Sequence, residues 1–188
     1  CRGGGACPVT APAAGRAASV PPVRVPTRTL AEGVWLLGGG SQSSVAVEFK
    51  NFVTVIEAPL DEERSLAVID AVQTLIPNKE IRYVVNTHHH FDHSGGLRTY
   101  VSQGTIVVGT PANLELYRTV MFYPMPRTLQ PDRFSTFSPM NTHNRSPFLM
   151  EPVNLQYVIS DGVRTLELHP VARNSHAVGM VMASLPTE

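Results

Sequence analysis

The 188-residue sequence predicts an α/β (α+β) protein in which helices flank a mixed β-sheet. Short apolar strands and helices follow one another in the order strand, strand, strand, helix, strand, helix, strand, which places the helices against a sheet face. A hydrophobic content of 43% with 16% charged residues fits a globular domain, and the length suffices for one sizeable core. The longest apolar runs are too short to span a bilayer.

The first 22 residues are rich in Gly, Ala and Pro and nearly lack large apolar side chains. Such a segment cannot bury enough surface to fold, so we expect residues 1–22 to be a disordered tail. Both cysteines of the chain, Cys1 and Cys7, lie in it. We expect spare thiols or a small disulfide, with acylation of Cys1 as a lesser alternative. The folded domain is then expected to comprise residues 23–188.

Runs of β-branched and aromatic residues between turn-forming residues mark the strands. Residues 50–51 (Lys-Asn) and 160–162 (Ser-Asp-Gly) have the composition of hairpin turns. A final apolar run follows a polar loop near the end of the chain. The predicted strands are residues 34–37, 44–49, 52–57, 81–86, 105–108, 155–159, 163–168 and 177–185.

Three segments have helical spacing of apolar residues. The first begins after the capping residue Asp61 and ends before Pro77, with acidic residues in its first turn. Residues 95–101 predict a short helix, and residues 110–122 a longer one. Residues 123–151 contain several prolines and are expected to be an irregular loop that covers a site or moves. The expected apolar stripes are Leu66, Ile69, Val72 and Ile76 in the first helix, and Leu114, Tyr117, Val120 and Met121 in the third.

Residues 87–96 contain four histidines and an aspartate, a composition that indicates a metal site. Imidazole is the commonest zinc ligand in proteins, and carboxylate is the usual oxygen ligand. Solvated histidine tracts also occur in linkers and tags, but they seldom follow an apolar strand. If the loop continued as a strand, His88, His90 and Asp92 would share one side. His89 would point to the other side, so we do not expect it to be a ligand.

This segment resembles the signature T-H-x-H-x-D-H-x-G-G of the metallo-β-lactamase fold superfamily, and every fixed position matches. The flanking elements also follow the family's order from about Gly33 onwards. The resemblance implies an αββα sandwich, of which this chain would supply the N-terminal half with its mixed sheet. It further implies a third metal histidine ahead of an apolar strand, where His176 and Gly179 fit the family's His-x-x-Gly form.

The resemblance implies two metal sites of unequal completeness. The first would consist of His88, His90 and His176. The second would use Asp92 and His93, together with a bridging acid and a further histidine that the family supplies later in the chain, beyond residue 188. Asp92 has an alternative catalytic role, in which it orients or deprotonates a water in a one-metal enzyme.

Neighbouring residues have supporting roles in the same interpretation. Glu57 ends a strand where the family more often has aspartate, and it is a candidate to orient a metal histidine. Gly95 and Gly96 would let the backbone approach the loop closely. His169 is expected at the surface or behind the ligands, and His143 is expected to be solvated.

Three neutral imidazoles on zinc leave a fourth position for water and lower the pKa of that water from about 16 to about 7. The resemblance therefore implies a hydrolase, with one or two zinc ions, that uses metal-bound hydroxide to cleave an ester, thioester, lactam or lactone bond in a small molecule. Iron-dependent oxidation of persulfides, known among relatives with the same loop, is one alternative. A catalytically incomplete half domain that binds metal is another.

Charge and chain ends add further expectations. The formal charge is zero and the fifteen basic residues are scattered, so we expect no nucleic-acid surface. The chain begins at Cys1 rather than Met, and the strand at 177–185 stops where a hairpin would begin. We therefore expect a fragment, truncated at its C-terminal end, in which this last strand lacks its partner. No pattern points to a compartment, an oligomeric state or a particular substrate.

Overall fold

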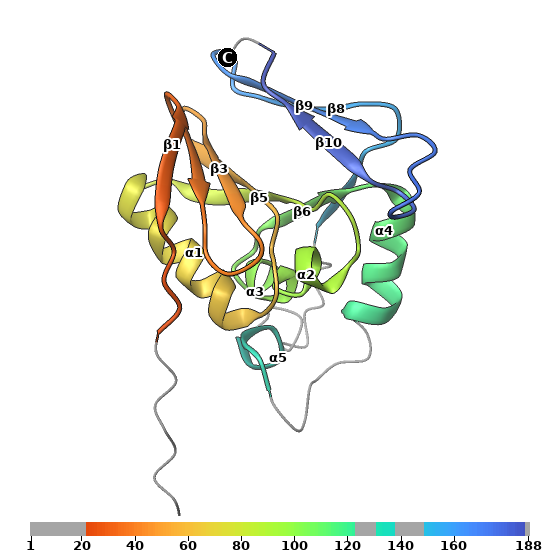
Figure 1. Ribbon diagram of the computed structural model, residues 1–188, viewed down its shortest axis with the longest axis horizontal. Helices are drawn as coiled ribbons and strands as arrows, with labels where there is room; N and C mark the ends of the chain where they lie inside the picture. Colours follow the sequence, from red (N-terminus) through yellow and green to blue (C-terminus); the bar gives the residue numbers. More distant parts are fainter. Residues whose placement is uncertain (1–21, 123–130, 138–148, 187–188) are drawn as a thin grey trace, which may run out of the picture.

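The computed structural model describes residues 22–122, 131–137 and 149–186, which form two β-sheets and several helices (Figure 1). Seven strands follow one another in chain order across the larger sheet. The first four are antiparallel neighbours, and the last four run parallel, so the sheet is mixed as predicted. These strands are β1 (Thr27–Ala31), β2 (Val34–Leu37), β3 (Ser44–Glu48), β4 (Phe52–Ile56), β5 (Glu80–Val85), β6 (Ile106–Gly109) and β7 (Met150–Pro152).

A smaller antiparallel sheet packs over one face of the larger one. It consists of β8 (Tyr157–Ser160), β9 (Thr165–Pro170) and β10 (Val181–Ser184), with β9 in the middle. Successive residues of a strand point to opposite faces, so each central strand contributes to two cores. The core between the sheets contains Val47, Phe52, Val85, Val108, Val153, Ile159, Leu166, Leu168 and Val181.

Helices cover the opposite face of the larger sheet, which gives a helix layer followed by two sheet layers (Figure 1). These helices are α1 (Glu62–Leu75), α2 (Phe91–Ser94), α3 (Leu97–Ser102), α4 (Pro111–Leu116) with a π-helical continuation (Tyr117–Met121), and α5 (Arg133–Phe137). This arrangement confirms the α/β fold class and its helix-flanked mixed sheet. Among the described residues, no helix is both long enough and apolar enough to cross a bilayer.

Helix α1 begins as predicted, because the Asp61 side chain accepts a hydrogen bond from the Arg64 amide at 2.9 Å. Its buried face differs from the expected stripe. Leu66 is only partly buried, whereas Val68 and the side chain of Arg64 are buried together with Ile69 and Val72. The stripe predicted for residues 110–122 is also partly wrong. Val120 is 67% exposed, because a residue six positions after the buried Leu114 faces away from it on a helix.

The region expected to be irregular contains two regular elements. Residues 133–137 form α5, whose Phe134 is fully buried, and residues 150–152 pair with β6 as strand β7. An ion pair between Arg98 of α3 and Asp132 fixes the start of α5. The two residues are 34 positions apart, so no local sequence pattern predicts this contact. Met140, His143 and Phe148 lie outside the described residues.

The last predicted strand is shorter than expected and it has a partner. β10 pairs with β9 over four residues, from Val181 opposite Pro170 to Ser184 opposite Glu167. The expectation that this strand lacks a partner is therefore wrong for one of its edges, because β9 folds back beside it. Residues 1–21, which include both cysteines, lie outside the described residues.

Candidate metal centre

The histidine-rich segment leaves the larger sheet at the C-terminal end of β5, next to the end of the parallel strand β4. Ligand sites of open α/β sheets form at this edge. Residues 87–90 have no regular structure, and helix α2 begins at Phe91. The segment therefore does not continue as a strand, and Asp92 and His93 occupy a helical turn instead of alternating with His88 and His90.

His88 is the most enclosed of the clustered histidines, with 2% of its surface exposed. The Thr87 hydroxyl lies 2.9 Å from Nδ1 of His88 and fixes the orientation of the ring. Burial lowers the pKa of His88 to about 4, and the nearby charges of His93, His90 and His176 act in the same direction. A neutral imidazole with one nitrogen already bonded is the form in which histidine binds a metal.

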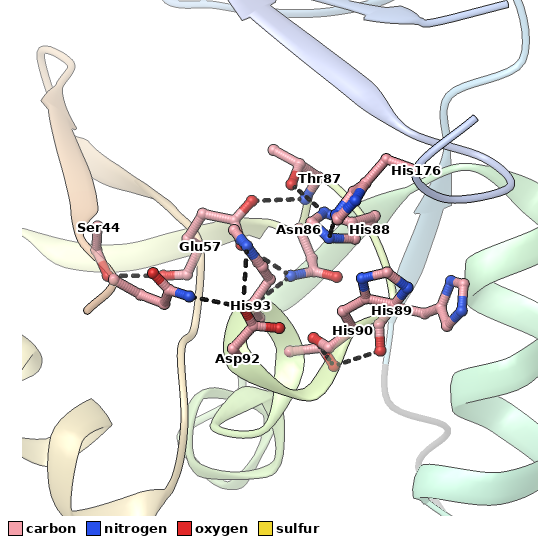
Figure 2. Close-up of polar contacts among 12 residues, drawn as sticks. Ser44, Glu57, Asn86, Thr87, His88, His89, His90, Asp92, His93 and His176 are labelled. Carbon is pink, nitrogen blue, oxygen red and sulfur yellow. Dashed lines mark hydrogen bonds and ion pairs between the residues drawn. The ribbon is translucent and has the colours of Figure 1, made fainter. Parts of the chain in front are cut away.

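His88, His90 and His176 converge from two distant parts of the chain (Figure 2). One ring nitrogen of each lies within 4.8 Å of the others, and Nε2 of His88 is 3.1 Å from Nε2 of His176. Two nitrogens that share a tetrahedral zinc at about 2.05 Å would be about 3.3 Å apart. The donor type and the spacing therefore fit a zinc ion held by three imidazoles.

The loop that carries His176 is held against the core by backbone contacts. The carbonyl of Gly179 accepts hydrogen bonds from the Thr110 hydroxyl at 2.8 Å and from the side-chain Nδ2 of Asn113 at 2.7 Å. Next along the chain, the amide of Val181 donates to the carbonyl of Thr87 at 2.8 Å. Gly179 has a φ of 75°, and a Cβ there would lie 2.3 Å from the Thr110 hydroxyl. The close approach that brings His176 to His88 therefore requires glycine.

Asp92 and His93 lie to one side of the three-histidine cluster (Figure 2). The rings of His93 and His88 are 4.2 Å apart, and Nε2 of His93 is 3.6 Å from Oδ2 of Asp92. The same carboxylate oxygen accepts a 2.6 Å hydrogen bond from Gln42. Desolvation opposes a low pKa of Asp92, but the bond from Gln42 and the charge of His93 outweigh it and lower the pKa.

Glu57 lies directly behind His93. Its carboxylate is 3.1 Å from Nδ1 of His93, and it also accepts hydrogen bonds from the Thr87 amide at 2.9 Å and the Asn86 side chain at 3.3 Å. Burial raises the pKa of Glu57, and the bonds from Thr87 and the interaction with His93 oppose part of that rise. Glu57 has a φ of 74°, a conformation that non-glycine residues adopt rarely. Its contact with His93 is the one that an orienting role would need.

Gly95 and Gly96 lie where the metal loop meets the segment between β4 and α1. A Cβ on Gly95 would lie 1.9 Å from the carbonyl oxygen of Leu60, and one on Gly96 would lie 1.9 Å from the Ser65 hydroxyl. The amide of Gly96 donates to the carbonyl of Ala58 at 2.9 Å. Any larger residue at either position would push α2 away from α1.

Two other histidines are not part of the three-histidine cluster, although the ring of His89 lies 5.0 Å from that of His90. His89 is turned away from His88 and His176 (Figure 2). His169 lies within β9, opposite Met182, and its Nε2 is 3.2 Å from the carboxylate of Glu167. Neither belongs to the three-histidine group.

Several residues at the site were not predicted. Gln42 is 50 positions from Asp92, and the Gly38–Ser43 stretch carries no recognisable signal apart from its glycines. Asn86 donates to the carbonyl of His93 at 2.8 Å and accepts a short hydrogen bond from the Tyr117 hydroxyl. A polar residue at the end of an apolar strand was the available signal for Asn86.

The sequence pattern described as "Metallo-beta-lactamase superfamily" matches residues 37–181. The chain belongs to this superfamily. The match includes the histidine-rich segment and His176, so the superfamily's motif and the three-histidine geometry coincide in one molecule.

Solved structures of superfamily members share the fold. A DIM-1 metallo-β-lactamase is 15% identical with a TM-score of 0.61, and the match covers 87% of this chain and 66% of that one. A metallo-β-lactamase from Pontibacter korlensis is 16% identical with a TM-score of 0.61, with coverage of 87% and 67%. FIM-1 from Pseudomonas aeruginosa, solved in a mono-zinc form, is 18% identical with a TM-score of 0.55, with coverage of 87% and 66%.

The chain thus spans about two thirds of the length of these structures. No curated protein matches it. At these identities the likeness establishes the fold, and the superfamily match establishes the family.

Proposed function

We propose that the protein is a zinc-dependent hydrolase whose metal is held by His88, His90 and His176. The convergence of three imidazole nitrogens within 4.8 Å carries this proposal. Zinc sites that keep three protein ligands and one open position are the catalytic kind. When bound, zinc would supply an activated water as the nucleophile and a positive charge that stabilises a developing oxyanion.

The chain's own residues would prepare this chemistry. Burial keeps His88 neutral, and the Thr87 hydroxyl at Nδ1 leaves Nε2 for the metal. His90 and His176 approach from either side, and their rings are 4.7 Å apart. The hydrogen bonds from Thr110 and Asn113 to Gly179 would hold His176 at the cluster before a metal binds, so the loop would not have to move on binding.

Asp92 is the proposed catalytic carboxylate. It stays ionised at neutral pH, since the Gln42 bond and the His93 charge lower its pKa despite desolvation. An ionised carboxylate beside the cluster would accept a hydrogen bond from the attacking water and take up its proton. In the alternative with two metals, Asp92 and His93 would instead be ligands of the second metal, with Glu57 orienting His93 through the 3.1 Å contact.

The proposed substrate is a small molecule with an ester, thioester, lactam or lactone bond. DIM-1 and the other solved relatives are named as metallo-β-lactamases, which makes a lactam the first substrate to assay. The site is partly open, because His176 is exposed while His88 is buried. A carbonyl group would therefore reach the cluster from the side of the His176 loop.

Chelation tests the hydrolase proposal. The protein is assayed with a chromogenic lactam, a p-nitrophenyl ester, a thioester and a lactone, before and after complete removal of metal. We expect hydrolysis of at least one substrate to disappear with the metal and to return when zinc is added. Hydrolysis that survives complete removal of the metal would overturn the proposal.

Metal analysis separates the two alternatives. Histidine-carboxylate sites also suit iron, which would favour oxidation of a persulfide. Expression without added metal followed by elemental analysis should yield zinc if the protein is a hydrolase, and iron if it is an oxygenase. Zinc binding without turnover of any substrate in the panel would support the third possibility, a metal-binding half domain.

A further inference from the structure

A side-chain amide from a distant loop meets the proposed catalytic carboxylate. Nε2 of Gln42 donates to Oδ2 of Asp92 at 2.6 Å, and Nε2 of His93 lies 3.6 Å from the same oxygen. A carboxylate accepts hydrogen bonds without donating any, whereas an amide NH₂ can donate. Glu57 restrains the opposite nitrogen of His93 at 3.1 Å, so the polar contacts run from Gln42 through Asp92 and His93 to Glu57.

The loop that delivers Gln42 is fixed at both ends. At its start, the guanidinium of Arg64 donates to the carbonyl of Leu37 at 3.0 Å. Gly39 has a φ of 131°, and a Cβ there would lie 2.8 Å from Nη1 of Arg64. At its end, the Ser44 hydroxyl donates to the carbonyl of Glu57 at 3.0 Å. These anchors leave residues 38–43 little freedom, so the direction of Gln42 is set by the fold.

Burial of Arg64, which anchors the start of this loop, has a desolvation cost. Its side chain is buried on α1, and its Nε and Nη1 atoms have no hydrogen-bond partner among the described residues. Burial lowers the pKa of Arg64, in line with the cost of desolvating its charge. Within the described part of the chain, the guanidinium donates to the end of β2, from which the Gln42 loop departs.

We propose that Gln42 is the positioning residue for Asp92: its amide, aimed by the anchored Gly38–Ser43 loop, holds Oδ2 and so sets the direction in which the carboxylate meets a bound metal or the attacking water. This inference rests on the proposed function. It adds to the site a residue from outside the histidine motif. The loop between β2 and β3 would thereby help to position the carboxylate near the end of β5.

A double-mutant cycle with Co²⁺ tests this role. The affinity of the metal-free protein for Co²⁺ is measured by competition with a chromophoric chelator for the unmodified chain, Gln42→Ala, Gln42→Glu, Asp92→Asn and Gln42→Ala/Asp92→Asn. Gln73→Ala is the matched control, because Gln73 is exposed near the end of α1, at the other end of the helix from Ser65, which contacts the metal loop at Gly96. Thermal melts of each variant establish that it is folded.

We expect Gln42→Ala to weaken, about ten-fold, the binding of the Co²⁺ equivalent that Asp92 would help to hold, the lower range for loss of a group that orients a metal ligand. The isosteric Gln42→Glu should weaken it at least as much, because it replaces a donor with a charge that repels Asp92. In the Asp92→Asn background, Gln42→Ala should have no further effect, and Gln73→Ala should change nothing.

The outcomes separate this inference from the proposed function. If Asp92→Asn weakens Co²⁺ binding but Gln42→Ala does not, or if Gln42→Ala has equal effects in both backgrounds, the positioning role is overturned and the three-histidine site stands. If the unmodified chain fails to bind Co²⁺, the proposed function falls as well. NMR of the metal-free protein gives an independent arm, because Asp92→Asn should shift the side-chain amide protons of Gln42. Unchanged Gln42 signals would also overturn the role.

Discussion

Protonation of His88 destabilises the folded state, because its imidazole ring is buried and held in one orientation. Its ordinary pKa of 6.5 falls to about 4 through burial and the neighbouring histidines. Between these two values the unfolded chain binds more protons than the native chain, so native stability must decrease as the pH falls through this window. The stability that neutral His88 provides is fully present above the unfolded pKa.

Urea unfolding of the metal-free protein measures this effect. The free energy of unfolding should drop between about pH 7 and about pH 4.5, and His88→Gln should show a smaller drop because it lacks the titrating ring. An identical pH dependence in both proteins would show that His88 has an ordinary pKa.

Adjacent histidines provide a sharp test of which side chains hold the metal. His90→Ala removes a member of the cluster, whereas His89→Ala removes a neighbouring ring that is not part of it. The first change should weaken zinc binding by more than the roughly 10–100-fold that loss of an outer partner costs. The second should leave the affinity nearly unchanged. Equal losses in competition titrations would mean that the cluster is not the binding site.

At the residue scale, the family signature was the most informative part of the sequence. It predicted His88 and His90 from their spacing and His176 from its place before an apolar strand, and the structure brings these three candidate ligands together. Gln42 could not be found in this way, because its contact with Asp92 depends on how the β2–β3 loop crosses the end of β4. The prediction that Asp92 shares one side of a strand with His88 and His90 was also wrong, because a helical turn begins at Phe91.

Gly95 and Gly96, between α2 and α3, pack against the start of α1 and the residues before it, and this packing positions the metal loop. Gly96→Ala would place a methyl group 1.9 Å from the Ser65 hydroxyl, so the helices must separate. We expect a loss of about 1–3 kcal/mol in the free energy of unfolding, together with weaker zinc binding. Gly109→Ala is the matched control, because its nearest atom would be 3.6 Å away. Equal denaturation midpoints for both variants would contradict this packing account.

The anchor of the His176 loop can be weakened without touching a ligand. Thr110→Val keeps the shape of the side chain but removes the hydroxyl that donates to Gly179. We expect stability to fall by about 1 kcal/mol and zinc affinity by about ten-fold, as His176 becomes less well placed. Thr105→Val is the control, since it removes a hydroxyl bonded to Ile81, away from the cluster. If both variants bind zinc equally well, the anchor has no role in positioning His176.

At the element scale, local patterns identified the strong elements and missed the weak ones. Strands β2 to β6 and helix α1 follow from apolar runs and caps. β1 was missed because it is an exposed edge strand with little apolar signal, and β7 because three residues ending in Pro152 resemble a loop. The position of α5 depends on the Arg98–Asp132 ion pair, which joins segments that are not neighbours in the chain.

The whole molecule places its site where three layers meet. The helix layer supplies Asp92 and His93, the end of the larger sheet supplies His88 and His90, and the loop before β10 brings His176 (Figure 1). The αββα architecture was inferred from one motif and the order of elements, and the helix and sheet layers agree with it. The pairing of β10 with β9 was missed, because the sequence does not show that the chain folds back there.

A zinc titration by calorimetry, with and without the His176→Ala change, tests the central claim that three imidazoles from two parts of the chain form one metal site. We expect one tightly bound zinc per chain and loss of tight binding in His176→Ala, with any second zinc held weakly. Two tightly bound equivalents, or tight binding that persists without His176, would contradict it.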